Sequence, residues 1–151
     1  MHRHTAQVRW ERKDALFTDH RYSRAHIWRF DGGAEVPASS SPLVVREPMS
    51  DPKGVDPEEA FIAALSSCHM LFFLDFASRS GFVVDSYVDD AIGVMGKDED
   101  GKDYVATVDL RPVITFSGKS PNAEELADLH HRSHDVCFIA RSVKTRVTVR
   151  A

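Results

Sequence analysis

Cysteine is scarce in this chain, with only Cys68 and Cys137 among 151 residues. So low a content excludes the disulfide-dense class of small secreted domains. With 42% hydrophobic residues, a chain of this length buries roughly 70% of its unfolded surface and builds a core without covalent staples. Two cysteines in a reducing compartment are more often inert, metal-bound or redox-active than permanently paired.

An apolar leader is also missing. The first residues, MHRHTAQVRWERKD, contain no apolar stretch with a small-residue cleavage site, so we expect a cytoplasmic protein. The longest apolar run, Ala60 to Leu74, is interrupted by Ser66, Ser67 and His69 and is too short to span a bilayer. This run predicts a buried helix and no membrane partner.

The chain lacks a basic stripe as well. Its 19 Lys and Arg and 23 Asp and Glu are interspersed, and the formal net charge is −4. Phosphate binding needs clustered positive charge, so we expect no nucleic-acid partner. No repeat, low-complexity tract or shift in composition divides the sequence, which predicts one domain over residues 1–151.

The first third of the chain has strand character. Ala6 to Glu11 and Tyr22 to Phe30 predict two strands, and Asp31 to Gly33 supplies residues that favour a turn. The following stretch, VPASSSPLVVREPMSDPKGVDP, is rich in Pro and Ser. It predicts a long loop around a short strand at Leu43 to Arg46.

A helix start is then well marked. Asp56 can cap it, Pro57 suits the first helical position, and Glu59 completes a capping box. Apolar residues recur at steps of three and four until Gly81, which predicts one broad inward stripe. Its members are Phe61, Ala64, Leu65, Cys68, Leu71, Phe72 and Phe76. Cys68 is therefore expected to face inward.

The second half predicts two long strands, Tyr87 to Met95 and Tyr104 to Phe116, joined at the hairpin signal Asp100-Gly101, with Pro112 at an edge or a bulge. A second helix follows, capped by Ser120 with Pro121 behind it. One face of it is traced by Leu126, Leu129, Ser133, Val136 and Cys137. The alternating run Ser142 to Arg150 predicts a last strand. This order is α+β with mostly antiparallel pairing.

Three interpretations of Cys68 stay open at this point. Free Cys often packs as a small hydrophobe. A zinc site is the second interpretation, with Cys68 or a distant histidine as the fourth ligand. Its other ligands would come from the run HHRSHDVC, which holds His130, His131, His134 and Cys137. A redox pair of cysteines is the third.

A redox cysteine has its own requirements. A thiol reacts as its thiolate, which a nearby cation stabilises. Attack on a peroxide yields a sulfenic acid, and a second cysteine condenses with it to form a disulfide. Neither predicted helix places an obvious cation beside Cys68, so the candidates are Arg24, Arg29 and Arg46.

Pro57-Glu58-Glu59, Cys68 at the end of FIAALSSC, and a lone Cys137 before a closing alternating strand resemble the OsmC/Ohr family of thiol-dependent hydroperoxide reductases. The resemblance covers nearly the whole chain. It implies an OsmC-like α+β fold, with mostly antiparallel sheets around a central buried helix, in an intertwined homodimer.

The resemblance also implies roles for individual residues. Cys68 would be the peroxidatic residue, Cys137 the resolving one, and Glu58 the acid that holds an arginine over the thiolate. Arg24 is similar to the arginine of the Ohr branch and is favoured; Arg46 is the alternative from the OsmC branch.

The implied activity is the cytoplasmic reduction of organic hydroperoxides, an antioxidant role in stress response. It needs no cofactor and no metal, because an external dithiol restores the cysteines. The alternative is a non-catalytic OsmC-like protein that binds a small apolar ligand or a metal. Two positions depart from the family pattern, since His69 replaces an aromatic residue and Phe138 replaces a proline.

Helix geometry adds an argument for a dimer. Glu58 and Cys68 are ten residues apart, which is about 15 Å along a straight helix and about 80° around it. One chain cannot bring both to one site on such a helix. We therefore expect a homodimer in which antiparallel copies of the helix place Glu58 of one chain near Cys68 of the other.

Overall fold

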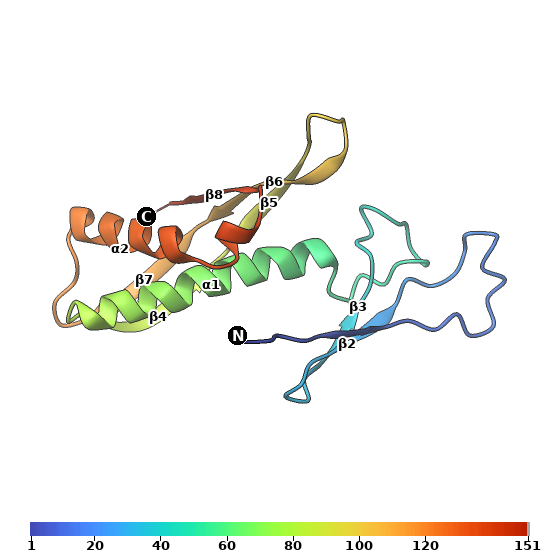
Figure 1. Cartoon of the computed structure of the whole chain (residues 1–151), viewed down its shortest axis with the longest axis horizontal. Coiled ribbons are helices and arrows are strands. Elements are labelled where there is room, and N and C mark those ends of the chain that lie inside the picture. Colours follow the sequence, from blue (N-terminus) through green and yellow to red (C-terminus); the bar gives the residue numbers. More distant parts are fainter. Residues whose placement is uncertain (151) are drawn as a thin grey trace. The chain divides into compact units, whose positions relative to one another are not determined.

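The computed structural model describes residues 1–150 and divides into two compact units, Met1–Ala60 and Phe61–Ala151, each described by itself. The first unit contains one antiparallel sheet of order β1-β2-β3 (Figure 1). Its strands are β1 (Gln7–Arg9), β2 (His26–Arg29) and β3 (Glu35–Ala38).

The predicted turn joins β2 to β3. The Phe30 amide donates to the Ala34 carbonyl at 3.0 Å, and Gly33 adopts a φ of 94°, where a side chain would be strained. The short strand predicted at Leu43 to Arg46 is wrong. The amides of Val44 and Val45 both donate to the Ser41 carbonyl at 2.9 Å, so this segment forms a turn. The third strand is β3, at the start of the predicted loop.

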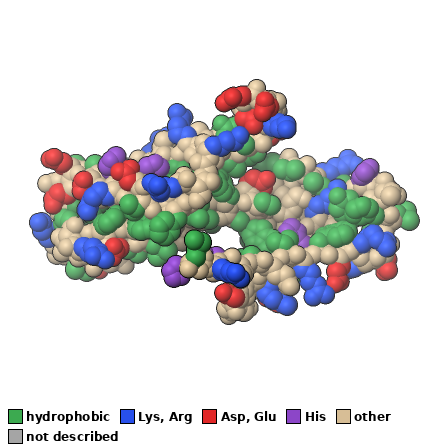
Figure 2. Space-filling view, in the orientation of Figure 1, with side chains coloured by type: hydrophobic (Ala, Val, Ile, Leu, Met, Phe, Trp, Pro, Cys, Tyr) green, Lys and Arg blue, Asp and Glu red, His purple; other side chains and the backbone are tan. Residues whose placement is uncertain are grey.

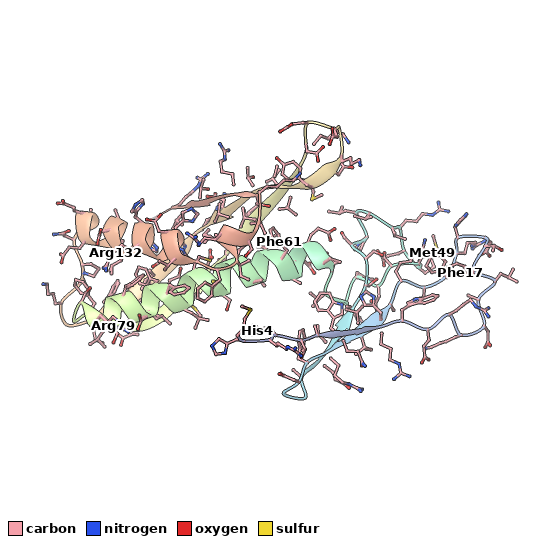
Figure 3. All side chains as sticks on the ribbon, in the orientation of Figure 1. His4, Phe17, Met49, Phe61, Arg79 and Arg132 are labelled. Atoms are coloured by element: carbon pink, nitrogen blue, oxygen red, sulfur yellow. The ribbon has the colours of Figure 1, made fainter. Side chains whose placement is uncertain are left out.

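Helix α1 (Pro57–Arg79) follows the prediction at both ends. The Glu59 amide donates to the Asp56 carboxylate at 2.8 Å, and the Asp56 amide donates to the Glu59 carboxylate at 3.0 Å, which completes the capping box. Gly81 has a φ of 83° just past the last turn. The helix begins in the first unit, and Figure 3 marks Phe61 and Arg79 at the two ends of its stretch in the second.

The second unit contains two sheets and a second helix. One sheet pairs β4 (Val83–Asp89) with β7 (Pro112–Ser117). The other has the order β5-β6-β8, from β5 (Ile92–Lys97), β6 (Asp103–Leu110) and β8 (Arg146–Val149). Its β6–β8 pairing is parallel. Helix α2 (Ala123–Val136) and a short 3-10 turn (Ala140–Ser142) lie between β7 and β8 in the chain. The architecture is α+β, as predicted.

The two long strands predicted in this unit are in fact four. Each run changes sheet part-way, the first between Asp89 and Ile92 and the second at Arg111. At this corner the Arg111 amide donates to the Asp89 carboxylate at 2.6 Å. This bond satisfies a backbone amide that lies between β6 and β7 and belongs to neither strand. Pro112 pairs with Asp89 at the end of the two-stranded sheet, in keeping with its expected edge position.

The inward face of α1 lies one position away from the predicted stripe. Its fully buried residues are Leu65, His69, Phe73 and Ala77, spaced by four. Leu71 is 60% exposed and Cys68 is half-buried. The buried line joins both cores of the unit, because Leu65 packs with Val108 and Leu110, whereas Phe73 packs with Leu129 and Phe82. His69 is therefore the central inward residue, in place of Cys68.

The cap of α2 also differs from the prediction. Asn122, and not Ser120, is the N-cap: its side chain accepts from the Glu125 amide at 2.8 Å. Glu125 returns the bond by accepting from the Asn122 amide at 3.1 Å. A reciprocal box satisfies two free amides where a lone serine satisfies one, so the helix starts two residues later.

Helix α1 is long and apolar enough to cross a membrane, by length and composition only, because it extends beyond the apolar run Ala60 to Leu74 at both ends. The core helix of a soluble protein passes the same test. Part of the apolar surface of α1 is unburied, since Leu71 is exposed; Val136 at the end of α2 and Phe138 just after it are exposed as well. Figure 2 shows hydrophobic side chains gathered along the helices of the second unit.

Candidate active site

The two cysteines come together in the second unit. Cys68 lies half-buried on α1, and Cys137 is the C-cap of α2, only 1% exposed. Both are free thiols. The Cys68 side chain lies close enough to Cys137 to raise the pKa of that thiol. Positions 69 residues apart in sequence thus form one thiol pair.

The surroundings of Cys137 favour its protonated form. Burial raises the pKa of this thiol, and the neighbouring Cys68 thiol raises the pKa further. The Ala140 amide, 3.5 Å from the sulfur, acts in the opposite direction but more weakly than burial. A buried, protonated thiol is a poor first nucleophile, whereas the more accessible Cys68 can meet a substrate.

Two phenylalanines accompany the thiol pair. Phe72 lies one helical turn after Cys68, and Phe138 directly follows Cys137. Their rings meet edge to face with centroids 5.1 Å apart. Phe138 is 70% exposed, so it presents an apolar surface beside the thiols. In the sequence Phe138 stands out only as a departure from the family pattern, and its contact with Phe72 was not predicted.

Arg24 lies in the first unit, in the loop just before β2. Its guanidinium stacks on the Tyr22 ring at 3.6 Å and donates to the carbonyls of Tyr22 and His20, and its own amide donates to the Met49 carbonyl at 2.8 Å. The side chain is therefore held in one place by the loop.

A pocket of about 460 Å³ opens beside Arg24. Its lining is mostly apolar and includes Val8, Trp10, Phe17, Tyr22 and Pro57. Phe17 has a φ of 73°, a left-handed conformation that costs about 1–2 kcal/mol. Its ring stacks on Tyr22 with centroids 4.6 Å apart, and this packing offsets the strain. In Figure 3, Phe17 lies among the loops of this unit together with Met49.

The other predicted partners of the thiolate also belong to the first unit. Arg46 is exposed in the loop before α1. Glu58 stands in the first turn of α1, and its Oε2 is buried without a hydrogen-bond partner among the described residues. An unpaired buried carboxylate oxygen is costly, so this position calls for a cation or a donor. The pairing of an arginine with Cys68 stays a prediction, because arginines and thiol lie in different units.

These features agree with the comparisons with known proteins. The family model described as OsmC-like protein matches residues 50–151. The chain belongs to the OsmC family. Its fold is similar to that of an OsmC-like protein of unknown function from Vibrio cholerae O1 biovar eltor, with 53% identity over 99% of both chains and a TM-score of 0.96. No curated protein sequence matches the chain.

Two more distant structures share the fold alone. An organic hydroperoxide resistance protein from Elizabethkingia anophelis is 17% identical over 99% of this chain and 93% of its own, with a TM-score of 0.71. The organic hydroperoxide resistance protein OhrB of Bacillus subtilis is 16% identical over 99% and 98%, with a TM-score of 0.63. By their names, both of these proteins are organic hydroperoxide resistance proteins.

The histidines of α2 do not form the alternative zinc site. Within residues 1–150, no group of three or more His, Cys, Asp or Glu side chains could hold a metal ion. His131 is exposed and lies 3.4 Å from the Asp135 carboxylate, one turn along the same helix. His130 turns the other way, into the core, where it meets His69.

Proposed function

We propose that this OsmC-family protein is a thiol-dependent peroxidase that reduces organic hydroperoxides. The observation that carries the proposal is the contact between an accessible Cys68 and a buried Cys137 whose pKa is raised. Such a pair divides the cycle between two thiols. The accessible thiol attacks the peroxide, and the buried thiol stays protonated until it reacts with the sulfenic acid that forms.

In the first step the Cys68 thiolate attacks one oxygen of the hydroperoxide. An S–O bond forms, the O–O bond breaks, and the alkoxide leaves as an alcohol after it takes up a proton. Cys68 is oxidised to a sulfenic acid. The aromatic pair Phe72–Phe138 supplies apolar contact for an organic substituent beside the sulfur.

In the second step Cys137 attacks the sulfenic sulfur. The S–S bond forms, and hydroxide leaves as water with the proton that Cys137 releases. An external dithiol then reduces the disulfide by exchange and is itself oxidised. No cofactor enters this cycle, and a reducing, cytoplasmic compartment suits it.

Arg24 and Glu58 are the proposed supports of the thiolate. Arg24 is held by Tyr22 at the rim of an apolar pocket, whereas Arg46 is exposed, which favours Arg24 for the role. The unpaired Oε2 of Glu58 offers the anion that such an arginine needs. A guanidinium next to a thiolate stabilises the charged form.

The proposal includes a homodimer. Leu71 and Phe138 are exposed large apolar residues near the thiol pair, and a second copy would cover them. Helix geometry leads to the same expectation, because Glu58 and Cys68 are ten residues apart on α1. Each site would then combine Cys68 and Cys137 of one chain with Glu58 of the other.

Anaerobic thiol titration tests the activity. The reduced protein is mixed with one equivalent of tert-butyl hydroperoxide, and free thiols are counted before and after. The expected result is the joint loss of both thiols and the release of one equivalent of alcohol. Cys68→Ser is the matched control and should consume no peroxide. Unchanged thiols and peroxide in the wild-type protein would refute the proposal.

A further inference from the structure

A pair of buried histidines joins the two helices that carry the cysteines. Nε2 of His69 lies 3.0 Å from Nδ1 of His130, and the rings stack with centroids 5.3 Å apart at an angle of 11°. The two residues are 1% and 4% exposed. Among the described residues this is the only side-chain hydrogen bond between α1 and α2.

The bond requires a definite protonation state. One of the two facing nitrogens must carry a hydrogen and the other must offer a lone pair, as in two neutral rings. The outer nitrogens, Nδ1 of His69 and Nε2 of His130, have no partner among residues 1–150. A proton added there places a charge in the core, and a proton on each ring sets N–H against N–H.

The groups that surround the two histidines determine their protonation. Burial lowers the pKa of each ring to about 4, and repulsion from His130 and then from His134, both on α2, adds to the lowering for His69. The Asp89 carboxylate of β4 acts in the opposite direction on His130. Phe73 of α1 stacks on His130 with ring centroids 4.6 Å apart, and Tyr87 of β4 packs on the same Phe73 ring at 5.6 Å. Burial outweighs the carboxylate, so both rings are neutral near pH 7.

The position of the pair connects it to the thiols. His69 directly follows Cys68 on α1. His130 precedes Cys137 by seven residues, which is about two turns of α2 and therefore the same side of that helix. Any sliding of α2 along α1 that moved Cys137 away from Cys68 would also break the histidine bond.

We infer that the His69–His130 bond is a positioning element that holds α2 in register on α1, so that Cys137 stays within bonding reach of Cys68. The reason for such an element rests on the proposed peroxidase cycle, in which the disulfide must form again at each turnover. Its effect on the two thiols is independent of peroxide and can be measured without it.

The quantity to measure is the equilibrium with dithiothreitol. In this exchange the Cys68–Cys137 bond forms, the disulfide of oxidised dithiothreitol breaks, and the two thiol protons pass to the released reagent. The equilibrium constant gives the effective concentration of one thiol at the other. It is read at pH 7 from the thiol and disulfide fractions after acid quenching.

Two amide pairs of identical composition form the comparison. In His69→Gln with His130→Asn, the amides replace the two bonded nitrogens, because a Gln amide lies near Nε2 and an Asn amide near Nδ1 of the original ring. In His69→Asn with His130→Gln, the amides instead lie near Nδ1 of His69 and Nε2 of His130. These are the two nitrogens that do not face each other, so the bond cannot form. His131→Asn is the surface control, since His131 is exposed on α2.

The first pair should keep the equilibrium constant within about threefold of the wild-type value, whereas the second should lower it at least tenfold. His131→Asn should leave it unchanged. Equal constants for the two amide pairs would overturn the inference, whether both match the wild type or both fall. A protein that forms the disulfide with these differences but consumes no peroxide would refute the proposed function and leave the inference standing.

Discussion

At the scale of single residues, the two cysteines differ in what surrounds them. Cys137 is buried and its pKa is raised, whereas Cys68 is half-buried on a helix face that also carries exposed Leu71. The difference supports the proposed roles, which are attack for Cys68 and resolution for Cys137. Neither role follows from the sequence pattern alone, which placed both residues on inward faces.

Replacing each cysteine should separate these roles. Cys68→Ser should abolish peroxide reduction by at least a thousandfold, since no other described thiol is accessible. Cys137→Ser should allow one turnover and then leave Cys68 as a sulfenic or sulfinic acid. Stopped-flow peroxide consumption with mass spectrometry of the product distinguishes the two outcomes. Loss of the first turnover in Cys137→Ser would contradict the assignment.

The two candidate arginines can be compared in the same assay. A charge that stabilises a thiolate by about 1.4 kcal/mol raises its population tenfold. Arg24→Ala should therefore slow peroxide reduction at pH 7 about tenfold or more. Arg46→Ala, which removes an exposed side chain, should change the rate less than twofold. The reverse pattern would assign the role to Arg46.

At the scale of elements, the contact between α1 and α2 depends on neutral histidines. In the unfolded chain His69 and His130 take up protons near pH 6.5, but in the folded chain only near pH 4. The unfolded state thus binds more protons between these values, and stability falls as the pH falls. Above pH 6.5 both rings are neutral in the folded and the unfolded chain, so the histidine contact contributes its full stability.

Urea unfolding at pH 7 and pH 4.5 measures this dependence. The wild-type protein should lose on the order of 2 kcal/mol of stability per ring over that interval. The double variant His69→Gln with His130→Asn cannot titrate at these positions, so it should lose much less. An equal loss in both proteins would assign the acid sensitivity to groups other than these two histidines.

The capping box of α2 provides a second test at this scale. Asn122→Ala removes the acceptor for the Glu125 amide and should lower the free energy of unfolding by about 1 kcal/mol. Ser120→Ala, at the position predicted from the sequence, should have almost no effect. Thermal unfolding of the two variants compares the two caps directly. A larger loss of stability in Ser120→Ala than in Asn122→Ala would contradict the assignment of Asn122 as the N-cap.

At the scale of the whole molecule, the proposed site combines residues of two chains. Cys68→Ser and Glu58→Ala chains should each be inactive alone, because each lacks one member of the site. After they are refolded together, half of the sites in a mixed dimer contain both intact residues, and activity should return in part. Each variant refolded alone is the control. Proven subunit exchange without recovery, or a monomer in sedimentation at micromolar concentration, would argue against a shared site.

Much of this protein could be predicted from the sequence, because the deciding signals are local. The capping box at Asp56 and Glu59, the turn at Gly33 and the stop at Gly81 depend on neighbours a few residues away, and the structure has all three. The spacing of Pro57-Glu58 and Cys68 likewise led to the family that the comparisons show. Local geometry is set by short-range sterics and hydrogen bonds, which the order of residues already specifies.

The tertiary structure decided what depends on packing partners. Apolar periodicity cannot tell which of two adjacent helix faces is covered, so only the fold shows that His69 lies inward and Cys68 is half-buried. A run of strand-forming residues does not reveal where it passes from one sheet to another, as at Asp89 and Arg111. The contact of Cys68 with Cys137 and the bond of His69 with His130 span more than sixty positions. Pairs so distant in sequence meet only when the whole core forms, because no local interaction brings them together.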